Sequence, residues 1–585
     1  MTSIDTAPAG ETAGRTPSPA PARLFLTLAS VFLAAGALLY MGAISRLIWP
    51  EALGDAAYLS FGRLLPVATG LLLGWLLLAA VAGAWYVLPR VGGSAPDPRF
   101  MGAAIALVAI GVLAGVVAVA TGHGEGGRYL EGPWYGEAAV ALGLLLAAVA
   151  VTRSSRAAAD DLPMAGWYLA GALWWGFGAA AVAAIPGLEG IPAALQARFA
   201  ATTLTGLVPV AAGLGAVYYL VGRLIPDASF HRRLGPIGFW SLGFSWLWLG
   251  PATLQYGPTP DWLETVPVLF AMGLVVALLA ILADLAHATR GRMDALGGSR
   301  PLQLALLGML PFVLLVGQQL IGSLRGPSGV VHFTDWESAL DVLTLLGSAT
   351  LWMTALAAHV LPGERGWNRL LGAIHLDLMA AGLVAALIGF WVAGLQQGYA
   401  WVASVNTGTP AAGDAFGPSV VAIEAMRATA LVGLALVAAG VLAYLGAALA
   451  SLASRPLPDS PVTMAGAGPG GAAVWKGALA LLVLASLAVF VLPSIDAGTE
   501  ASALATYTRE HPDASPQARG RQIYLSEGCW QCHTQQVRAV VADVGLGTVS
   551  MPGDYVYDGG DLLGARRIGP DLTHVAGRDW DFDSL

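Results

Sequence analysis

Apolar stretches of about 20 residues recur along most of this chain, separated by short polar segments. A helix needs about 20 consecutive apolar residues to cross the hydrocarbon core of a bilayer. The pattern predicts membrane helices at 24–44, 65–88, 101–121, 134–152, 164–186, 200–222, 236–254, 264–287, 302–323, 338–361, 371–396, 420–452 and 476–494. We therefore expect an all-α protein, a polytopic membrane bundle of about 12 helices followed by one further membrane helix.

Changes in composition divide the chain into five parts. Residues 1–22, rich in Ala, Pro, Thr and Gly, predict a disordered cytoplasmic tail, and 23–452 form a membrane block. A Gly/Pro/Ala-rich linker at 453–474 leads to an anchor helix at 475–495. Charged residues then return in 496–585, which predicts a small water-soluble α-helical domain.

Composition and charge limit the partners. Hydrophobic residues make up 56% of the chain and charged residues 11%, and the net charge is -8. This composition predicts membrane lipid as the surroundings and argues against nucleic acid as a partner.

Basic residues indicate the orientation. With a cytoplasmic N-terminus, the inside loops hold Arg15, Arg23, Arg90, Arg99, Arg153, Arg156, Arg223, Arg232, Arg233, Arg290, Arg292, Arg300, Arg365, Arg369, Arg455 and Lys476. The outside loops before the last helix hold only Arg46, Arg63, Arg128, Arg198 and Arg325. This bias fits the positive-inside rule. An odd number of spans then places 496–585 on the outer, periplasmic side of a bacterial inner membrane.

Both cysteines of the chain lie in Cys529-Trp530-Gln531-Cys532-His533. Two thiols at this spacing add to the vinyl groups of haem, and the adjacent imidazole becomes an iron ligand. A zinc site would need a second pair of cysteines, which the sequence lacks. We therefore predict one covalent haem c held by Cys529 and Cys532, with His533 on the iron.

Two sets of motifs carry a family resemblance. GRQIYLSEGCWQCHTQQVR (520–538), GDYVYD (553–558) and GPDLTHVAGR (569–578) resemble the mono-haem subunit of cbb3-type cytochrome c oxidases, the C family of haem-copper oxygen reductases. The membrane block is similar to the catalytic subunit of the same oxidases, on the segments LSFGRLLPVATG (59–70), FWSLGFSWLWLGPATLQYGPTPDW (239–262), HFTDW (332–336), FWVAGLQQGYAW (390–401) and IEAMR (423–427). The resemblance implies a fusion of two oxidase subunits.

The resemblance also implies a site at which this chain has lost its ligands. The family's catalytic subunit holds two haems b and a copper through six histidines, and it cross-links a tyrosine to one copper ligand. The histidine positions fall on Ala68, Thr202, Ala252, Thr253, Leu340 and Val342, and the tyrosine position falls on Trp246. We therefore expect no haem b and no copper in the membrane block.

The histidine census gives the same expectation without the family. Of the nine histidines, three lie in 496–585 and four lie in or near loops. Only His359 and His375 remain, near inner helix ends. Haem iron and copper need several inward-facing imidazoles. We expect Trp246, Trp248 and Trp262 to fill space that haem occupies in the family, although the threonine and alanine replacements leave a lipid- or quinone-sized ligand as an alternative. Solvation at helix ends is expected to account for most of the carboxylates Asp284, Asp341, Asp377 and Glu424.

The sixth ligand of the haem c iron is open. Met551 is the only methionine after the haem motif, and Met551-Pro552 resembles the ligand environment of c-type cytochromes. The family's methionine lies further downstream than this chain extends. The alternatives are His574, a five-coordinate iron, or a chain truncated at Leu585.

These observations predict a membrane-bound c-type cytochrome that transfers electrons in a respiratory chain. Its partners would be other respiratory subunits, or a soluble cytochrome or cupredoxin as electron donor. One alternative is a working cbb3-type oxidase or a nitric oxide reductase. A second alternative is a non-redox scaffold or assembly subunit.

Overall fold

The computed structural model describes residues 17–127, 129, 131–156, 162–406, 416–457, 461–462, 464, 466–468, 471–497, 515–556 and 562–575. Its first helices are α1 Ala20–Ile48, α2 Phe61–Val87, α3 Pro98–Ala120, α4 Trp134–Ser155, α5 Met164–Ala183, α6 Gly190–Thr202, α7 Val208–Leu224, α8 Leu234–Trp246, α9 Thr265–Thr289 and α10 Met293–Gly298. They are followed by α11 Arg300–Ser323, α12 Arg325–Val331, α13 Trp336–Asp341, α14 Ser348–Val360, α15 Arg369–Asn406, α16 Phe416–Ala422, α17 Glu424–Leu452, α18 Gly471–Ser486 and α20 Pro516–Ser526. No strand occurs among the described residues.

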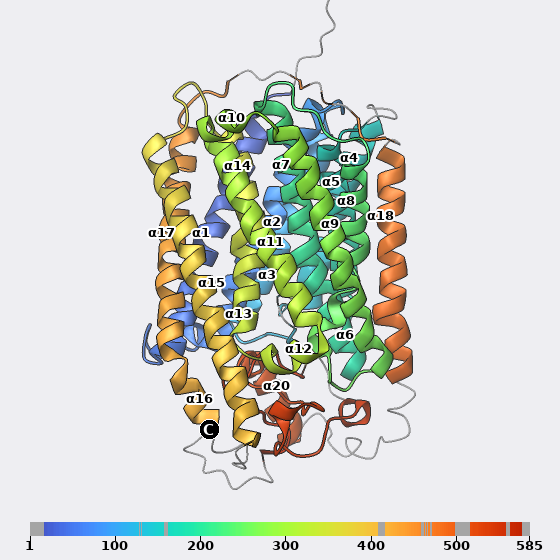
Figure 1. Cartoon of the computed structure of the whole chain (residues 1–585), viewed down its shortest axis with the longest axis vertical. Helices are drawn as coiled ribbons and strands as arrows, with labels where there is room; N and C mark the ends of the chain where they lie inside the picture. Colours follow the sequence, from blue (N-terminus) through green and yellow to red (C-terminus); the bar gives the residue numbers. More distant parts are fainter. Residues whose placement is uncertain are drawn as a thin grey trace, which may run out of the picture.

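The long helices run side by side and form one bundle (Figure 1). Helix α1 packs between α2 and α17, and α15 packs along α17. The anchor helix α18 lies at the edge of the bundle, against α5. Within the described residues, 11 helices are long and apolar enough to cross a membrane. The predicted all-α membrane bundle is therefore confirmed.

Three predicted helix ranges differ in detail. The range 236–254 is not one helix, because α8 ends at Trp246 and Gly250-Pro251 opens a separate 3-10 turn. The range 200–222 lies within a longer element, in which a π-helical stretch at Thr203–Leu207 joins α6 to α7. The range 420–452 is not one helix, because the helix is interrupted at Ile423, between α16 and α17.

The predicted tail, 1–22, is too long by three residues. Helix α1 begins at Ala20, because Pro19 and Pro21 suit the first turn of a helix, where a missing N–H costs nothing. The part of the tail before residue 17 lies outside the described residues.

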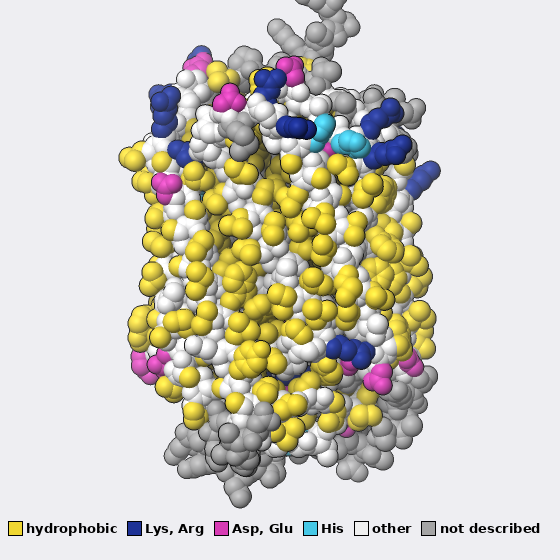
Figure 2. Space-filling view, in the orientation of Figure 1, with side chains coloured by type: hydrophobic (Ala, Val, Ile, Leu, Met, Phe, Trp, Pro, Cys, Tyr) yellow, Lys and Arg dark blue, Asp and Glu magenta, His cyan; other side chains and the backbone are white. Residues whose placement is uncertain are grey.

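Residues 515–556 and 562–575, here termed the C-terminal domain, lie at one end of the bundle, in contact with α12 and α15 (Figure 1). Basic side chains gather at the opposite end on the face drawn in Figure 2. Between the two ends that face is almost entirely hydrophobic, as a surface in contact with lipid must be.

The contact between the C-terminal domain and the membrane block, here termed the seam, includes backbone packed on backbone. A Cβ added to Gly62 at the start of α2 would lie 2.3 Å from the Glu527 carbonyl oxygen. A Cβ on Gly528 would lie 2.0 Å from the Gly62 oxygen. Beside them, Arg63 Nη2 lies 2.5 Å from Glu527 Oε1. No side chain larger than hydrogen fits between these backbones.

We predict that Gly62→Val separates the C-terminal domain from the membrane block and leaves the bundle folded. The new Cβ would meet the Glu527 carbonyl, and a backbone atom cannot rotate away as a flexible side chain can. Limited proteolysis in detergent should release the C-terminal domain at least several-fold faster than in the wild type. The matched control is Gly102→Val in α3, where an added Cβ meets no atom within 4 Å. Wild-type resistance of the Gly62→Val chain would contradict the prediction.

Candidate haem site and the surrounding seam

Helix α20 leads the chain into the haem motif. It begins where the Ser515 hydroxyl accepts a hydrogen bond from the Ala518 N–H, 3.1 Å away, with Pro516 in the first turn. It ends before Gly528, whose φ of 69° is the left-handed conformation that favours glycine after a helix. The next residues form the 3-10 turn Cys529–Gln531. Neither Cys529 nor Cys532 is in a disulfide.

The His533 ring is held with one nitrogen assigned. Its Nδ1 lies 2.8 Å from the Pro570 carbonyl oxygen, and because a carbonyl only accepts, Nδ1 must carry the proton. Nε2 therefore remains as the basic nitrogen for a metal. Burial lowers the pKa of His533, which keeps the imidazole in the neutral form that a metal needs. A Cβ on Gly569 would lie 2.1 Å from the ring, so only glycine fits beside it.

Burial also affects the pKa of the two thiols. It raises the pKa of Cys532 to about 12 and raises the pKa of Cys529 above its usual value. Both thiols are therefore neutral at pH 7 and do not behave as reactive thiolates. Two free thiols beside an imidazole whose Nε2 is available fit a covalently attached haem c.

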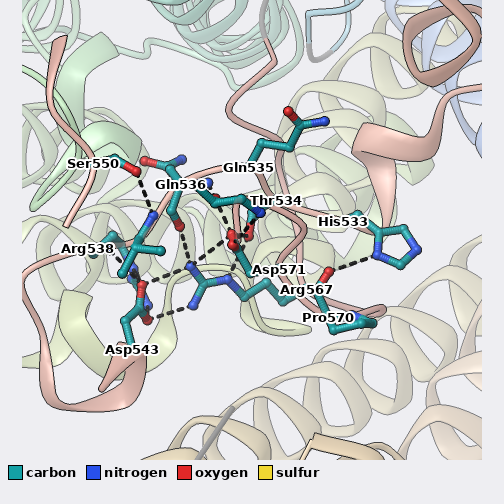
Figure 3. Close-up of polar contacts among 12 residues, drawn as sticks. His533, Thr534, Gln535, Gln536, Arg538, Asp543, Ser550, Arg567, Pro570 and Asp571 are labelled. Carbon is teal, nitrogen blue, oxygen red and sulfur yellow. Dashed lines mark hydrogen bonds and ion pairs between the residues drawn. The ribbon is translucent and has the colours of Figure 1, made fainter. Parts of the chain in front are cut away.

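A network of buried charges lies beside the haem motif (Figure 3). Asp543 accepts hydrogen bonds from both Arg538 and Arg567, with Arg567 Nη1 2.6 Å from Asp543 Oδ1. Burial alone would raise the pKa of Asp543, but the two guanidinium groups hold it well below its usual range. The Asp571 carboxylate accepts from the Thr534 hydroxyl at 2.6 Å and from the Gln536 N–H at 3.0 Å.

Further buried contacts cross the seam close to the haem motif. Arg566 makes an ion pair with Asp341 at the end of α13, and the Tyr129 hydroxyl donates to the same carboxylate. Gln531, inside the haem motif, donates to Glu131 at 3.3 Å. Arg198 donates to the Gly564 carbonyl at 3.0 Å. Solvation at a helix end is therefore wrong for Asp341, which is buried by the C-terminal domain and paired with Arg566.

Three of the six predicted ligand positions meet in space. Thr202, Thr253 and Leu340 line one cavity of about 40 Å³, together with Arg198 and Thr205 among others. The remaining positions, Ala68, Ala252 and Val342, are buried in the bundle. Thr202, Thr253 and Leu340 come from three separate segments, which are α6, the 3-10 turn Gly250–Leu254 and α13.

Trp246 occupies the space beside these positions. Its indole N–H donates to the Thr202 carbonyl at 3.2 Å, and its ring packs so closely on Gly206 that an added Cβ would lie 2.5 Å away. Trp248 stacks on Phe270 with ring centroids 4.4 Å apart. Trp262 is 44% exposed and donates to Asp496, so the expectation that it fills internal space is wrong.

The candidates for the sixth ligand are Met551, which precedes the 3-10 turn Pro552–Tyr555, and His574, which is half-buried. Met551 is 50% exposed and its N–H donates to the Asp554 carboxylate at 2.9 Å. His574 Nε2 lies 3.2 Å from the Thr548 hydroxyl. The ligand role of Met551 stays a prediction.

Two family models match the chain. The model described as "Cytochrome C and Quinol oxidase polypeptide I" matches residues 20–433. The model described as "Cytochrome C oxidase, mono-heme subunit/FixO" matches residues 475–583. Together they cover both the membrane block and the C-terminal domain.

Curated relatives and a solved structure agree with these matches. The cbb3-type cytochrome c oxidase subunit CcoN1 of Stutzerimonas stutzeri is 26% identical over 219 residues, which are 35% of this chain and 44% of that protein. A cytochrome c oxidase subunit 1 homolog of Agrobacterium tumefaciens is 24% identical, and the match spans 36% of this chain and 40% of the relative. A bacteroid subunit 1 homolog of Bradyrhizobium diazoefficiens is 24% identical over 64% of this chain and 72% of its own length.

A heme-copper terminal oxidase solved as a dimer by cryo-electron microscopy has the same fold, with a TM-score of 0.57 and 14% identity. The alignment covers 87% of this chain and 98% of that one. The chain therefore belongs to the family of cytochrome c and quinol oxidase polypeptide I, and it carries a segment of the mono-haem cytochrome c oxidase subunit type at its C-terminal end.

Proposed function

We propose that this protein is a membrane-bound c-type cytochrome of a respiratory chain, built on an oxidase scaffold that lacks haem b and copper. The observation that carries the proposal is a contrast between two sites. In the C-terminal domain, Cys529, Cys532 and His533 keep every group that attachment of haem c requires, down to the Pro570 carbonyl on Nδ1. In the membrane block, the family's six histidine positions carry Ala, Thr, Leu and Val.

The donor set of the membrane block argues against metal binding. Alanine, leucine and valine have no donor atom, and a threonine hydroxyl is a poor ligand for copper or haem iron beside an imidazole. Space argues the same way. An engineered protein cavity of about 150 Å³ binds benzene, whereas the cavity lined by Thr202, Thr253 and Leu340 has a volume of about 40 Å³. Haem, which is several times larger than benzene, does not fit this cavity.

Haem c, when attached, supplies a one-electron carrier. The chain contributes two thiols for attachment through Cys529 and Cys532 and a neutral imidazole from His533. The Pro570 carbonyl keeps the proton on Nδ1, and Gly569 allows close packing against the ring. The seam excludes water from one side of this motif, because Gly528 and Gln531 lie directly against the membrane block.

The distribution of charge supports an outer location of the haem. Basic side chains gather at the end of the bundle opposite the C-terminal domain (Figure 2), and basic ends face the cytoplasm in membrane proteins. The C-terminal domain then faces the outer, periplasmic side of a bacterial inner membrane. Electron partners would be other respiratory subunits, or a soluble cytochrome or cupredoxin that reaches this side.

A second candidate is a working oxidase or nitric oxide reductase, with the membrane block as its catalytic part. The match of residues 20–433 to polypeptide I, and the names of the relatives, favour it. That candidate requires haem b, which the donor set does not provide for. The haem content, the haem ligation and the uptake of oxygen or nitric oxide distinguish the two candidates.

The purified protein should contain one covalent haem c per chain and no haem b. The motif Cys529–His533 is complete, whereas the family's haem b ligand positions lack imidazoles. A pyridine haemochrome spectrum with quantitative protein determination measures both haems. A b-type component of matching stoichiometry would refute the loss of the membrane-block cofactors.

The double change of Cys529→Ala and Cys532→Ala should abolish covalent haem, and His533→Ala should abolish normal iron ligation. Membrane insertion should be unchanged, because the bundle is built from helices outside the C-terminal domain. Haem staining after denaturing electrophoresis, with optical spectra, reports on the haem. His123→Ala in a loop of the membrane block is the matched control, and it should keep wild-type haem content.

The pure protein should reduce its haem c with an artificial donor and yet consume neither oxygen nor nitric oxide. Reduction of oxygen requires a site that binds it and delivers four electrons, and the residues at the family's site supply no imidazole. Oxygen and nitric oxide electrodes give the measurement. Sustained cyanide-sensitive uptake by protein with equimolar copper would establish the second candidate instead.

A further inference from the structure

Phe333 lies in the segment His332–Trp336 of the membrane block and touches the C-terminal domain with its ring. The guanidinium carbons of Arg538 and Arg567 lie 4.5 Å and 4.9 Å from the centroid of this ring. The negative face of an aromatic ring attracts cations, most strongly when both are desolvated. Phe333 and both arginines are buried, so one ring from the membrane block holds two cations of the C-terminal domain.

The backbone at Phe333 is held in an unfavourable conformation. Its φ is 71°, in the left-handed region that costs energy for a bulky residue. In that conformation its carbonyl accepts the Arg567 N–H at 2.7 Å. Gln397 of α15 donates to the Arg567 carbonyl at 3.3 Å. The membrane block therefore binds Arg567 through the ring of Phe333 and through both backbone polar groups of the arginine.

The side chain of Arg567 continues the connection into the C-terminal domain. Its Nε donates to the Thr534 hydroxyl at 2.7 Å, and Nη2 donates to the Gln536 carbonyl at 2.7 Å. Nη1 pairs with Asp543 at 2.6 Å. The planar fork of arginine makes these contacts together, which the single ammonium of lysine cannot do.

Thr534 and Asp571 bring the connection to the iron ligand. Thr534 follows His533 directly, and its hydroxyl donates to Asp571 at 2.6 Å. Asp571 follows Pro570, whose carbonyl accepts from His533 Nδ1 (Figure 3). The hydrogen bond that orients the imidazole therefore joins His533 and Pro570. The residues that follow them, Thr534 and Asp571, are hydrogen-bonded to each other, and Arg567 holds Thr534.

We propose that Phe333 and Arg567 are positioning residues through which the membrane block sets the reduction potential of haem c. The proposal rests on the proposed attachment of haem c to Cys529 and Cys532. The hydrogen bond from Nδ1 to Pro570 makes the imidazole a stronger donor to iron and stabilises the oxidised state. If Phe333 or Arg567 no longer holds the Pro570–Asp571 turn in place, the hydrogen bond from His533 Nδ1 to Pro570 weakens. The reduction potential of haem c then rises.

The test is a redox titration of the full chain in detergent. Phe333→Ala and Arg567→Lys should each raise the midpoint potential, changing the ratio of oxidised to reduced haem at a fixed potential about threefold, or about 28 mV for one electron. The double variant should shift no further than the larger single variant, because both changes break the same connection. The electron paramagnetic resonance signals of the oxidised haem should change in the same variants.

Three controls isolate the effect. Phe333→Tyr keeps the face of the aromatic ring, so this variant should have the wild-type reduction potential. Phe416→Ala removes a ring that stacks on Trp401 in the membrane block instead, and it should leave the potential unchanged. Proteolysis should show the seam intact in Phe333→Ala, so that a shift reflects the positioning of the ligand and not loss of docking.

The outcomes separate this proposal from the proposed function. Wild-type protein without covalent haem c would refute the proposed function itself. Full haem content with equal potentials in all variants would refute the positioning role and leave the cytochrome function standing. Additive shifts in the double variant would mean that Phe333 and Arg567 act separately, which also overturns the proposal.

Discussion

Buried charges are paired across the seam between the membrane block and the C-terminal domain. Asp341 of the membrane block and Arg566 of the C-terminal domain are both almost fully buried, and each is the other's partner. A buried ion left without its partner costs about 3–5 kcal/mol. Either part alone would have to hydrate these groups, so docking stabilises both parts. This explains why the haem motif and the bundle form one structure although they match two separate family models.

The same constraint explains the position of the segment His332–Trp336. His332 pairs with Glu337 at 2.8 Å, and Asp335 pairs with Arg427 at 2.6 Å, all of them buried. Phe333 lies between these pairs with its ring turned to the C-terminal domain. A segment fixed at both ends presents a rigid aromatic surface, which is the kind of surface that can hold two arginines in defined positions.

Much of the fold followed from the sequence, because the apolar runs report directly on burial in lipid. Trp246–Leu254 was the weakest part, since Gly250-Pro251 interrupts an apolar run without changing its hydropathy. The haem motif was also readable, as its five residues are contiguous. The seam was not, because its partners are 225 residues apart for Asp341 and Arg566 and 464 apart for Arg63 and Glu527. Single charges near predicted helix ends resemble ordinary solvated residues, and Asp341 was misinterpreted for that reason. The reverse holds for Trp262, because an aromatic residue in the sequence resembles a buried one, whereas this side chain is 44% exposed.

The close packing of Gly62 on Gly528 bears on the order of biogenesis. The turn that carries both thiols is itself part of the seam, with Gly528 on one side of Cys529 and Gln531 on the other. An enzyme that joins haem to these thiols needs access to that turn, and docking would cover part of it. Attachment of haem would then precede docking, while α18 already tethers the C-terminal domain to the bundle. Attachment of haem and docking of the C-terminal domain would thus be consecutive steps, and attachment would have to be complete before docking.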